Sequence, residues 1–485
     1  MEKIFTKRNA FFLVGVIVLF KIFISAVLEL HPDEAYYWLW AQHLAPGYYD
    51  HSPMIAYFIK ITTLFSDSEV FVRLSSVITT VILSFLVWKF AKKLFGETVA
   101  AASVMTVNTL PLMLIGSVII TPDIPVFLFW SFAVYFLWKL SETNHIKYWY
   151  LAGIFFGLTI LSKYTGILFA PCMLVYMIFD KKLKWFKNPH FYMLFVTAFV
   201  VFLPVVYWNW QNGWISFTYQ LNHGLYNTKL NFGYIFEYLG GQALAAGPFI
   251  LIPGFMAAFV YFFSKDSKKI YLASFSLPVI LFFAATALKR LPGANWPAFA
   301  YFTLCIAVAQ YMLNGSKLRK NLLITGIVFN IVISVIVGLH AGYSIVPVAK
   351  FSEKAAVADA TNWFSGWNLL GGKLIEKNVK YAVTHAHQWG GAIAYYTKGK
   401  VTPVLDNVSK NRFNQFAYWD VPLDLDMSKT AIVMIDNRME DDFSNIENAE
   451  IIYVYRNAIP VRQYAISEVE GYTMNTDPKS VRQKH

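Results

Sequence analysis

Two adjacent carboxylates, Asp33 and Glu34, follow the first long apolar run of the chain almost directly. An ionisable group near hydrocarbon is costly, up to roughly 3 kcal/mol at the centre of a membrane helix, so such a group usually marks a site. The run reads Asn9 to Leu30, and the basic residues before it place its first end on the cytoplasmic side. The carboxylates therefore emerge at the outer surface, where they predict acid–base chemistry. The alternative is a solvated interfacial turn that caps the helix after Pro32.

Other polar residues stand in segments that the same topology places outside. Asp50 and His51 lie in the first loop just before Pro53, and Asp123 follows Pro122 at the very start of a later apolar helix. An aspartate at a helix start also has a purely structural explanation, because it interacts favourably with the helix dipole. A turn beside Pro53 equally explains His51.

Three cations are candidates for holding an anion at the same surface. Lys289 and Arg290 break the positive-inside pattern, and Lys163 lies at the outer tip of a short helical hairpin. Arginine offers a planar fork to phosphate and lysine a point charge. A misplaced span would explain the first two, and a side chain that snorkels to the surface would explain Lys163. Arg73, four residues after Glu69, is more simply a helix pair with it.

Carboxylates and cations on one face imply two opposed tasks. A carboxylate can deprotonate an acceptor hydroxyl, while a cation neutralises a departing phosphate. A glycosyl donor tethered to a polyprenyl phosphate needs this pairing together with an apolar groove for the lipid. A divalent metal that bridges Asp33 and Asp123 is a further option, because hard cations prefer carboxylates.

The composition is that of a polytopic membrane protein. Of 485 residues, 57% are hydrophobic, 18% aromatic and only 14% charged, whereas soluble domains carry about 25% charged residues. The net charge of +12 comes from short basic clusters between apolar runs, which is typical of cytoplasmic loops and argues against nucleic-acid binding. Cys172 and Cys305 both lie inside apolar stretches, so no disulfide framework is expected.

Apolar runs of spanning or near-spanning length predict about eleven transmembrane helices. The runs lie near 10–29, 70–91, 98–117, 122–139, 149–163, 164–179, 190–208, 237–263, 270–288, 294–313 and 321–343. This count leaves every basic cluster inside, with the N-terminus cytoplasmic and everything after Tyr343 outside. The first run is long for a signal peptide and lacks a clear cleavage site, so we expect a retained anchor.

The chain is predicted to form a transmembrane domain, 1–345, and a soluble extracytoplasmic α/β domain, 346–485. Tyr- and Trp-rich runs in the first loop, 31–69, favour helices that lie in the membrane interface. Short β-type runs appear in the tail at 381–384, 401–405, 431–435 and 451–455, with helical stretches between several of them. No nucleotide-binding loop or zinc spacing is present in the sequence, so ATP-driven transport lacks its signature.

These motifs together resemble the membrane glycosyltransferases of the C-type fold. The similar branch contains the protein O-mannosyltransferases and the bacterial lipid A aminoarabinose and galacturonic acid transferases. The likeness covers essentially the whole length. It rests on five segments: His31–Tyr37, Tyr49–Pro53, Thr121–Asp123, Ala294–Pro297 and Asn411–Phe416. The last two look more like bacterial lipopolysaccharide-type members than like eukaryotic mannosyltransferases.

The resemblance implies inverting transfer of a sugar from a polyprenyl-phosphate donor to lipid A, lipopolysaccharide or another envelope acceptor, at the outer face of the bacterial inner membrane. Asp33 is then the general base, and Glu34 and Asp123 orient acceptor or sugar. The implied donor-phosphate ligands are Lys163, Lys289, Arg290 and His51. The implied substrate-binding residues are Asp50, Tyr36, Tyr164, Asn295 and Trp296. No cofactor beyond the optional metal is implied.

One position departs from the aminoarabinose transferases of this branch. Some of them carry Glu-Lys before the proline, where this chain has Asp50, His51 and Ser52. Histidine is charged only part of the time at neutral pH, so the departure argues against aminoarabinose as the sugar.

Two other functions remain open. A protein O-mannosyltransferase would share the donor chemistry and accept a peptide. A secondary transporter would show inverted repeats and polar residues near the middle of the membrane.

Overall fold

The computed structural model describes residues 3–225, 230–405, 414–419, 429–441, 443, 446 and 448–469, without the side chains of 223–225. The chain divides into two compact units, and each is described here by itself. The first unit comprises Met1–Ile22, His51–Phe58 and Leu74–Val335. The second comprises Phe23–Asp50, Ile59–Arg73 and Ile336–His485. Much of the first loop therefore belongs to the same unit as the C-terminal segment.

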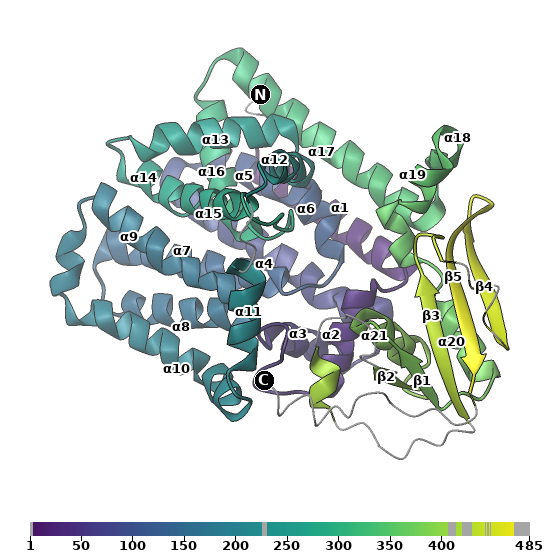
Figure 1. Cartoon of the computed structure of the whole chain (residues 1–485). Coiled ribbons are helices and arrows are strands. Elements are labelled where there is room, and N and C mark those ends of the chain that lie inside the picture. The colour runs from purple at the N-terminus through teal and green to yellow at the C-terminus, as the bar shows by residue number, and fades with distance from the viewer. Residues whose placement is uncertain are drawn as a thin grey trace. The chain divides into compact units, whose positions relative to one another are not determined.

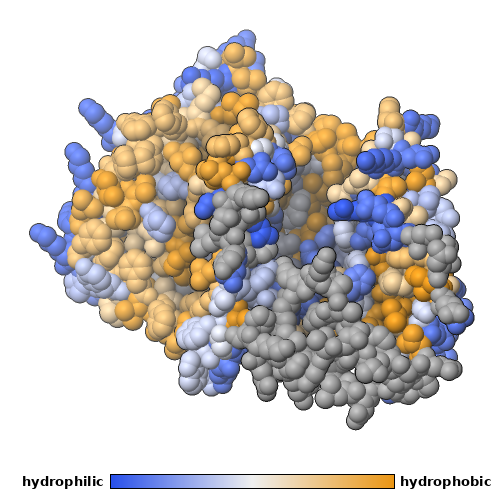
Figure 2. All heavy atoms as spheres, viewed as in Figure 1, coloured by the Kyte–Doolittle hydropathy of each residue, from blue (hydrophilic) through white to orange (hydrophobic). Residues whose placement is uncertain are grey.

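Six helices among the described residues are long and apolar enough to cross a membrane. They are α1 (Lys7–Val27), α4 (Glu69–Phe95), α7 (Asp123–Thr143), α10 (Pro189–Gln211), the consecutive helices α14 (Ser267–Ser274) and α15 (Leu277–Ala287), and α17 (Lys317–Tyr343) (Figure 1). Figure 2 shows apolar side chains gathered over the helices of the first unit. Phe199 and Val200 of α10, for example, are 54% and 58% exposed. A surface of this kind fits hydrocarbon and not water.

Two further helix pairs reach spanning length only when a sharp bend is included. The helix α5 (Glu97–Thr109) turns by 72° into α6 (Pro111–Leu114) and η1 (Gly116–Val118), and α12 (Gly233–Ala246) turns by 108° into α13 (Pro248–Phe262). A proline starts the second member of each pair, where its missing N–H costs nothing. Gly247 at the second bend has φ of +76°, and a Cβ there would meet Asn330.

The predicted count of eleven spans is not confirmed. All eleven apolar runs are largely helical, yet only six helices, or eight with both bent pairs, have the length and composition of a span among the described residues. The other helices of the first unit are shorter: α8 (Lys147–Ser162), η2 (Tyr164–Leu168), α9 (Phe169–Phe179), α11 (Ile215–Leu225), η4 (Ala298–Ala300) and α16 (Tyr301–Leu313). A hydropathy run records apolar length and not whether the helix axis stays straight. The multi-pass membrane class is nevertheless clear.

Small residues fix the position of α8, the helix that leads to Lys163. Gly153 and Gly157 face α10 so closely that an added Cβ would lie 2.6 Å from the backbone oxygens of Leu194 and Ala198. This spacing of small residues lets two helix backbones approach inside a membrane, where dispersion and packing drive helix association. Replacing either glycine would push α8 away from α10 and move its outer end.

The second unit contains a five-stranded sheet of order β2-β1-β3-β5-β4. The strands are β1 (Tyr381–Thr384), β2 (Thr402–Leu405), β3 (Thr430–Asp436), β4 (Ala449–Arg456) and β5 (Ile459–Glu468). Strand β1 pairs in parallel with β2 and β3, and β5 is antiparallel to both β3 and β4. The predicted α/β character of the tail is confirmed. The strand β5 was not predicted, because Pro460 and the polar pair Arg462 and Gln463 interrupt its pattern.

A helix of the first loop packs against the C-terminal part within this second unit. The helix α2 (Pro32–Gln42) contacts α21 (His387–Tyr396), and a Cβ added to Gly391 would lie 2.6 Å from the backbone of Tyr36. The remaining helices of the unit are α18 (Val348–Phe351), α19 (Glu353–Val357), η5 (Ala360–Phe364), α20 (Trp367–Glu376) and η6 (Gln415–Tyr418), while α3 (Met54–Thr63) has residues in both units. The loop helix is thus built into a compact unit and does not hang freely at the interface.

Candidate active site

Asp123 is the centre of a polar group in the first unit. It begins α7, and its side chain is only 9% exposed. Oδ1 accepts a hydrogen bond from Lys163 Nζ at 2.7 Å, and Oδ2 accepts one from Asn295 Nδ2 at 2.6 Å. The aspartate therefore does more than cap its own helix, because it gathers two segments 40 and 172 positions away along the chain.

Lys163 directly follows the last residue of α8, and its extended backbone connects α8 to η2. Its ammonium lies 5.6 Å from the ring centroid of Trp296, within the range of a cation–π contact. The side chain is 10% exposed and, within the described part of the chain, forms one hydrogen bond, to Asp123. A lysine ammonium has three N–H donors, so two of them remain for a ligand. The sequence placed Asp123, Lys163, Asn295 and Trp296 in outward loops, and the structure brings all four together.

Part of the first loop joins the same neighbourhood in this unit. Ser52 Oγ donates to the backbone oxygen of Ile160 at 3.0 Å, in the last turns of α8 before Lys163. Tyr164 is hydrogen-bonded to Ser216 at 2.9 Å, which anchors the residue after that lysine. His51 is partly buried and directly precedes Ser52. The turn that presents Lys163 is therefore fixed from several sides.

Asp33 belongs to the second unit and occupies the first turn of α2. His31 caps this helix: its Nδ1 accepts from the backbone N–H of Asp33 at 3.2 Å, and its own backbone N–H donates to Glu34 at 2.9 Å. This is a capping box, which fixes the first turn. The Asp33 side chain is 41% exposed, and one of its oxygens lies 3.6 Å from His31 Nδ1. It is an accessible carboxylate on a rigid backbone, as a general base requires.

Glu34, the next residue, is in the opposite situation. It forms an ion pair with Arg73 at 2.6 Å, and both side chains are 0% exposed. Arg73 also donates to the backbone oxygens of Ser25, Leu28 and Glu29, at the end of α1. As placed here, Glu34 positions α2 against the ends of α1 and α4 and does not face a substrate. The expected partner of Arg73, Glu69 on the same helix, is replaced by a residue 39 positions away.

Tyr36 and Asp50 form a second buried polar link in this unit. The Tyr36 hydroxyl donates to Asp50 Oδ2 at 2.7 Å and accepts from the backbone N–H of Gln415 at 3.0 Å. Gln415 Oε1 accepts from the backbone N–H of Tyr49 at 2.7 Å. Burial and the Asp50 carboxylate raise the pKa of Tyr36 well above its ordinary value, so the hydroxyl stays a donor. Of the predicted Asn411–Phe416 motif, 411–413 lie outside the described residues.

Lys289 and Arg290 follow the end of α15 and open the loop that leads to Asn295. Lys289 is exposed and Arg290 is partly buried. Their backbone N–H groups both donate to Thr286 O at 3.0 Å. The Lys289 side chain forms no ion pair within the described part of the chain, so the structure does not join it to the Asp123 group. Both residues remain candidate phosphate ligands at the other end of the same loop.

The residues present do not form a metal centre within either unit. Both oxygens of Asp123 already accept from nitrogen donors, which is the environment of an ion pair and not of a bound cation. No group of three or more His, Cys, Asp or Glu side chains that could hold a metal occurs among the described residues. His385 packs on Trp389, with ring centroids 4.4 Å apart, and His387 packs on Tyr36 at 4.7 Å. The proposed reaction therefore has no step that uses a metal.

Sequence reasoning missed one buried cation of the first unit. Lys21 lies within α1, is 0% exposed, and donates to Thr80 Oγ1 at 2.7 Å and Ser117 Oγ at 2.6 Å. Ser117 belongs to η1, a few residues before Asp123, so Lys21 braces the bent segment that leads to the site. The only signal in the sequence is a single lysine inside an otherwise apolar run.

Comparisons with known proteins identify the class that this fold and site define. Residues 50–208 match the family described as dolichyl-phosphate-mannose-protein mannosyltransferase. The matched stretch contains Asp50, His51, Asp123, Lys163 and Tyr164. The match covers about a third of the chain, and with the relatives below it confirms that the chain resembles the membrane glycosyltransferases of the C-type fold.

Particular relatives agree with this class. The chain is 27% identical over 302 residues to the lipid A galacturonosyltransferase RgtD of Rhizobium johnstonii, a match that covers 61% of this chain and 63% of that protein. The crystal structure of ArnT from Cupriavidus metallidurans in the apo state has the same fold, with a TM-score of 0.67, 13% identity, and coverage of 94% of this chain and 97% of that one. The structure of ArnT bound to undecaprenyl phosphate matches with a TM-score of 0.65, 14% identity, and coverage of 96% and 99%.

Proposed function

We propose that this protein moves a sugar from a polyprenyl-phosphate donor to lipid A or another envelope glycolipid, on the outer face of the bacterial inner membrane. The observation that carries the proposal is Lys163, a nearly buried ammonium with one N–H bonded to Asp123 and two N–H donors left over. A cation held in this way can stabilise a phosphate that gains negative charge as it leaves. The galacturonosyltransferase relative and the undecaprenyl phosphate bound to the ArnT fold support the same substrates.

The proposed reaction is a single inverting displacement. For a hydroxyl acceptor, Asp33 takes the proton while the acceptor oxygen bonds to the anomeric carbon of the sugar. The bond between that carbon and the phosphate oxygen breaks, and its electron pair leaves with the polyprenyl phosphate. Lys163 stabilises the new charge on the phosphate, with Lys289, Arg290 and His51 as further ligands. Proton removal and charge stabilisation then act at opposite sides of the sugar.

Other residues hold these groups in place. Asp123, itself held by Asn295, fixes the direction of the Lys163 ammonium, which lies beside the ring of Trp296. An aromatic face next to a cation also suits the apolar face of a sugar ring. The capping box at His31 and the buried Glu34 set the position of Asp33. Asp50, Tyr36 and Tyr164, which were predicted to bind substrate directly, are proposed instead to shape the loops around it.

The test is mass spectrometry of envelope lipids from strains with and without the gene. A mass difference of one hexose, hexuronate or amino sugar on lipid A would establish both donor class and acceptor. Complementation by the wild type and not by Asp33→Asn is the matched control. Identical lipid profiles in both strains, with the protein expressed, would refute the glycolipid acceptor.

The family match favours a second candidate with the same donor chemistry. The description of that family names a protein acceptor, so a protein O-mannosyltransferase remains the alternative. Purified enzyme offered a lipid A acceptor and a serine- and threonine-rich peptide, each with polyprenyl-phosphate sugars, separates the two. Transfer to the peptide alone would favour the alternative.

A further inference from the structure

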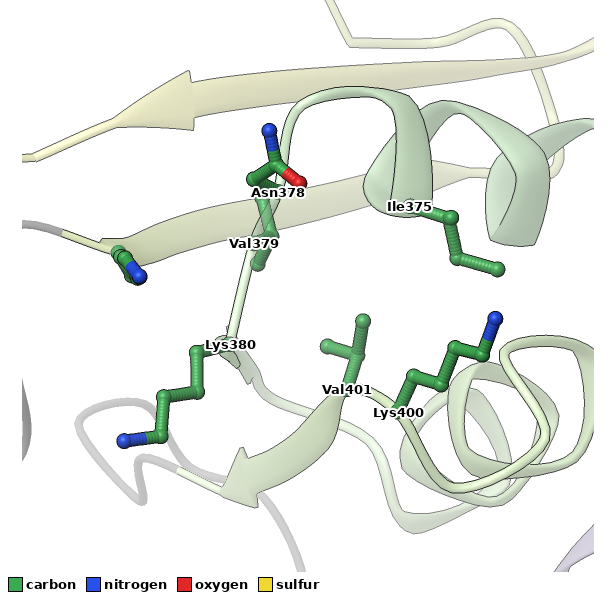
Figure 3. A pocket seen from close by; sticks show the side chains of 7 residues that line it. Ile375, Asn378, Val379, Lys380, Lys400 and Val401 are labelled. Carbon is green, nitrogen blue, oxygen red and sulfur yellow. The ribbon is translucent and has the colours of Figure 1, made fainter.

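The C-terminal sheet carries a basic surface that none of the roles above uses. Three lysines, Lys380, Lys400 and Lys429, line a cavity of about 660 Å³ together with Asn378 and a floor of apolar side chains. Figure 3 shows Ile375 on α20, Asn378 and Val379 in the segment after it, and Lys380, Lys400 and Val401 just before strands, with Lys400 pointing toward Ile375 and Lys380 extending away from both. None of the described residues that line it is acidic.

Sheet register places Lys380 and Lys429 side by side at the starts of β1 and β3, while Lys400 comes two residues before the start of β2. Strands β2, β1 and β3 are adjacent and parallel, and Lys380 and Lys429 directly precede the paired residues Tyr381 and Thr430. The backbone N–H of Lys380 donates to Lys429 O at 2.8 Å, and Lys380 O accepts from the N–H of Thr402 at 2.9 Å. Adjacent strands lie about 4.8 Å apart. Like charges held directly opposite each other are destabilising, so an anion between them would relieve a repulsion.

Other lysines of the same unit are neutralised, which makes the contrast informative. Lys373 lies 3.0 Å from Glu376, and Lys377 lies 3.0 Å from Glu450 and 3.1 Å from Glu468. Lys380, Lys400 and Lys429 have no carboxylate partner among the described residues. All three are exposed on flexible side chains, and the Lys380 ammonium lies 5.3 Å from the ring centroid of Tyr381, a contact that it can leave for a phosphate. The two groups of lysines in this domain thus differ in whether a carboxylate neutralises their charge.

We infer that this lysine cavity binds a phosphate group on the glycolipid acceptor. Lysine binds phosphate as a point charge, and a cavity of this size holds a phosphorylated sugar and not just an ion. The apolar floor, Ile375, Val379 and Val401, suits the C–H face of a sugar ring. The inference rests on the proposed function, since it assigns the acceptor's charged head group to this domain.

The test is direct binding of lipid A to the full-length protein in a neutral detergent. The probes are lipid A with both phosphates, the same lipid after phosphatase treatment, and inorganic pyrophosphate. The test variant is Lys380→Gln/Lys400→Gln/Lys429→Gln. A matched variant, Lys350→Gln/Lys354→Gln/Lys373→Gln, removes the same charge from elsewhere in the unit.

We expect the test variant to bind phosphorylated lipid A about tenfold more weakly than the wild type, the loss that three exposed charge contacts produce. The matched variant should bind as the wild type does, and dephosphorylated lipid A should bind the wild type as weakly as the test variant. The difference should shrink as salt rises from 50 to 500 mM, as for any screened contact.

Each other outcome has a definite meaning. Equal binding of phosphorylated lipid A by the test variant and the wild type would overturn the inference. Pyrophosphate that binds with the same lysine dependence, while lipid A does not compete, would overturn the glycolipid assignment and leave a soluble phosphate as the ligand. Lysine-dependent lipid A binding without sugar transfer would refute the proposed function and leave the site standing.

Discussion

Two buried ion pairs of this protein join Arg73 to Glu34 and Lys163 to Asp123. They differ in how many N–H donors of the cation are already hydrogen-bonded. Arg73 has five N–H donors, and all five are bonded: two to Glu34 and three to backbone oxygens at the end of α1. Lys163 uses one of its three donors, on Asp123. The first pair is saturated and fully buried, and the second is unsaturated and slightly exposed.

The comparison separates scaffold from site. A saturated pair cannot accept a ligand without breaking an existing bond, so it holds elements together. An unsaturated cation in a shielded position is poised for an incoming anion, because desolvation has already strengthened its field. The same distinction divides the adjacent carboxylates, since Asp33 is 41% exposed and Glu34 is buried against Arg73.

The largest expected effect comes from Asp33→Asn. The amide keeps the size of the side chain and removes the proton acceptor, so kcat should fall by about 10²–10⁴-fold, the usual contribution of a general base. The thermal unfolding midpoint should not change, because the side chain is exposed and its one ion pair among the described residues is with His31. Activity is measured on purified protein with a polyprenyl-phosphate sugar and lipid A. Retained activity would remove Asp33 as the base.

Whereas Asp33→Asn should lower kcat alone, Glu34→Gln should lower the stability of the fold. It leaves the Arg73 guanidinium buried without a counter-charge, which should cost about 3–5 kcal/mol of unfolding free energy. The readout is thermal unfolding in detergent, with Glu69→Gln on the neighbouring turn as the control. An equal loss in the control would mean that Arg73 relies on the local helix pair predicted from the sequence.

Lys163→Gln should reduce kcat by about 10²–10³-fold, as the loss of one oriented donor to a developing oxyanion does in other enzymes. Asp123 would keep its bond to Asn295, so the fold should survive. Lys147→Gln, at the other end of α8, is the matched control and should leave turnover unchanged. Comparable losses in both variants would point to general damage to α8.

The pair Lys289→Gln/Arg290→Gln should have a smaller effect, confined to the donor. Exposed charges contribute roughly 0.2–1 kcal/mol each, so the apparent KM for the donor should rise by about three- to tenfold. The kcat at saturating donor should not change. An unchanged KM for the donor would exclude both residues as phosphate ligands.

The last prediction concerns topology and should leave activity untouched. Single cysteines at Ser365 and Ser267, in a background without Cys172 and Cys305, should be labelled by an impermeant reagent from outside and inside respectively. Labelling in the reverse sense would overturn the orientation on which the outward site depends.

The sequence identified individual residues of the site, but it did not show which of them bond to one another. Asp123, Lys163 and Asn295 each stood out beside an apolar run, but residues 40 and 172 positions apart give no pairing signal in one sequence. Arg73 was expected to pair with Glu69 because a local pair is the only one that helical spacing can suggest. The strand β5 was missed for a related reason, since its polar residues are buried by contacts that form only in the folded unit.

The packing of the first-loop helix α2 against α21 of the C-terminal part could not be predicted from the sequence either. It depends on Gly391, where the lack of a Cβ lets α21 approach Tyr36 of α2. A glycine within a helix gives no sign of which neighbour it admits. The count of eleven spans is not confirmed, because α5–α6 and α12–α13 bend and the helices of the runs 149–163, 164–179 and 294–313 are shorter than the six spanning helices.

The most direct measurement is the affinity of undecaprenyl phosphate for three folded proteins: the wild type, Lys163→Gln and Arg73→Lys. The account predicts that Lys163→Gln binds at least about tenfold more weakly, since a hydrogen bond to a charged group is lost. It predicts that Arg73→Lys, although less stable, binds within about twofold of the wild type because Arg73 has no donor to spare. Weakened binding in Arg73→Lys together with wild-type affinity in Lys163→Gln would contradict it.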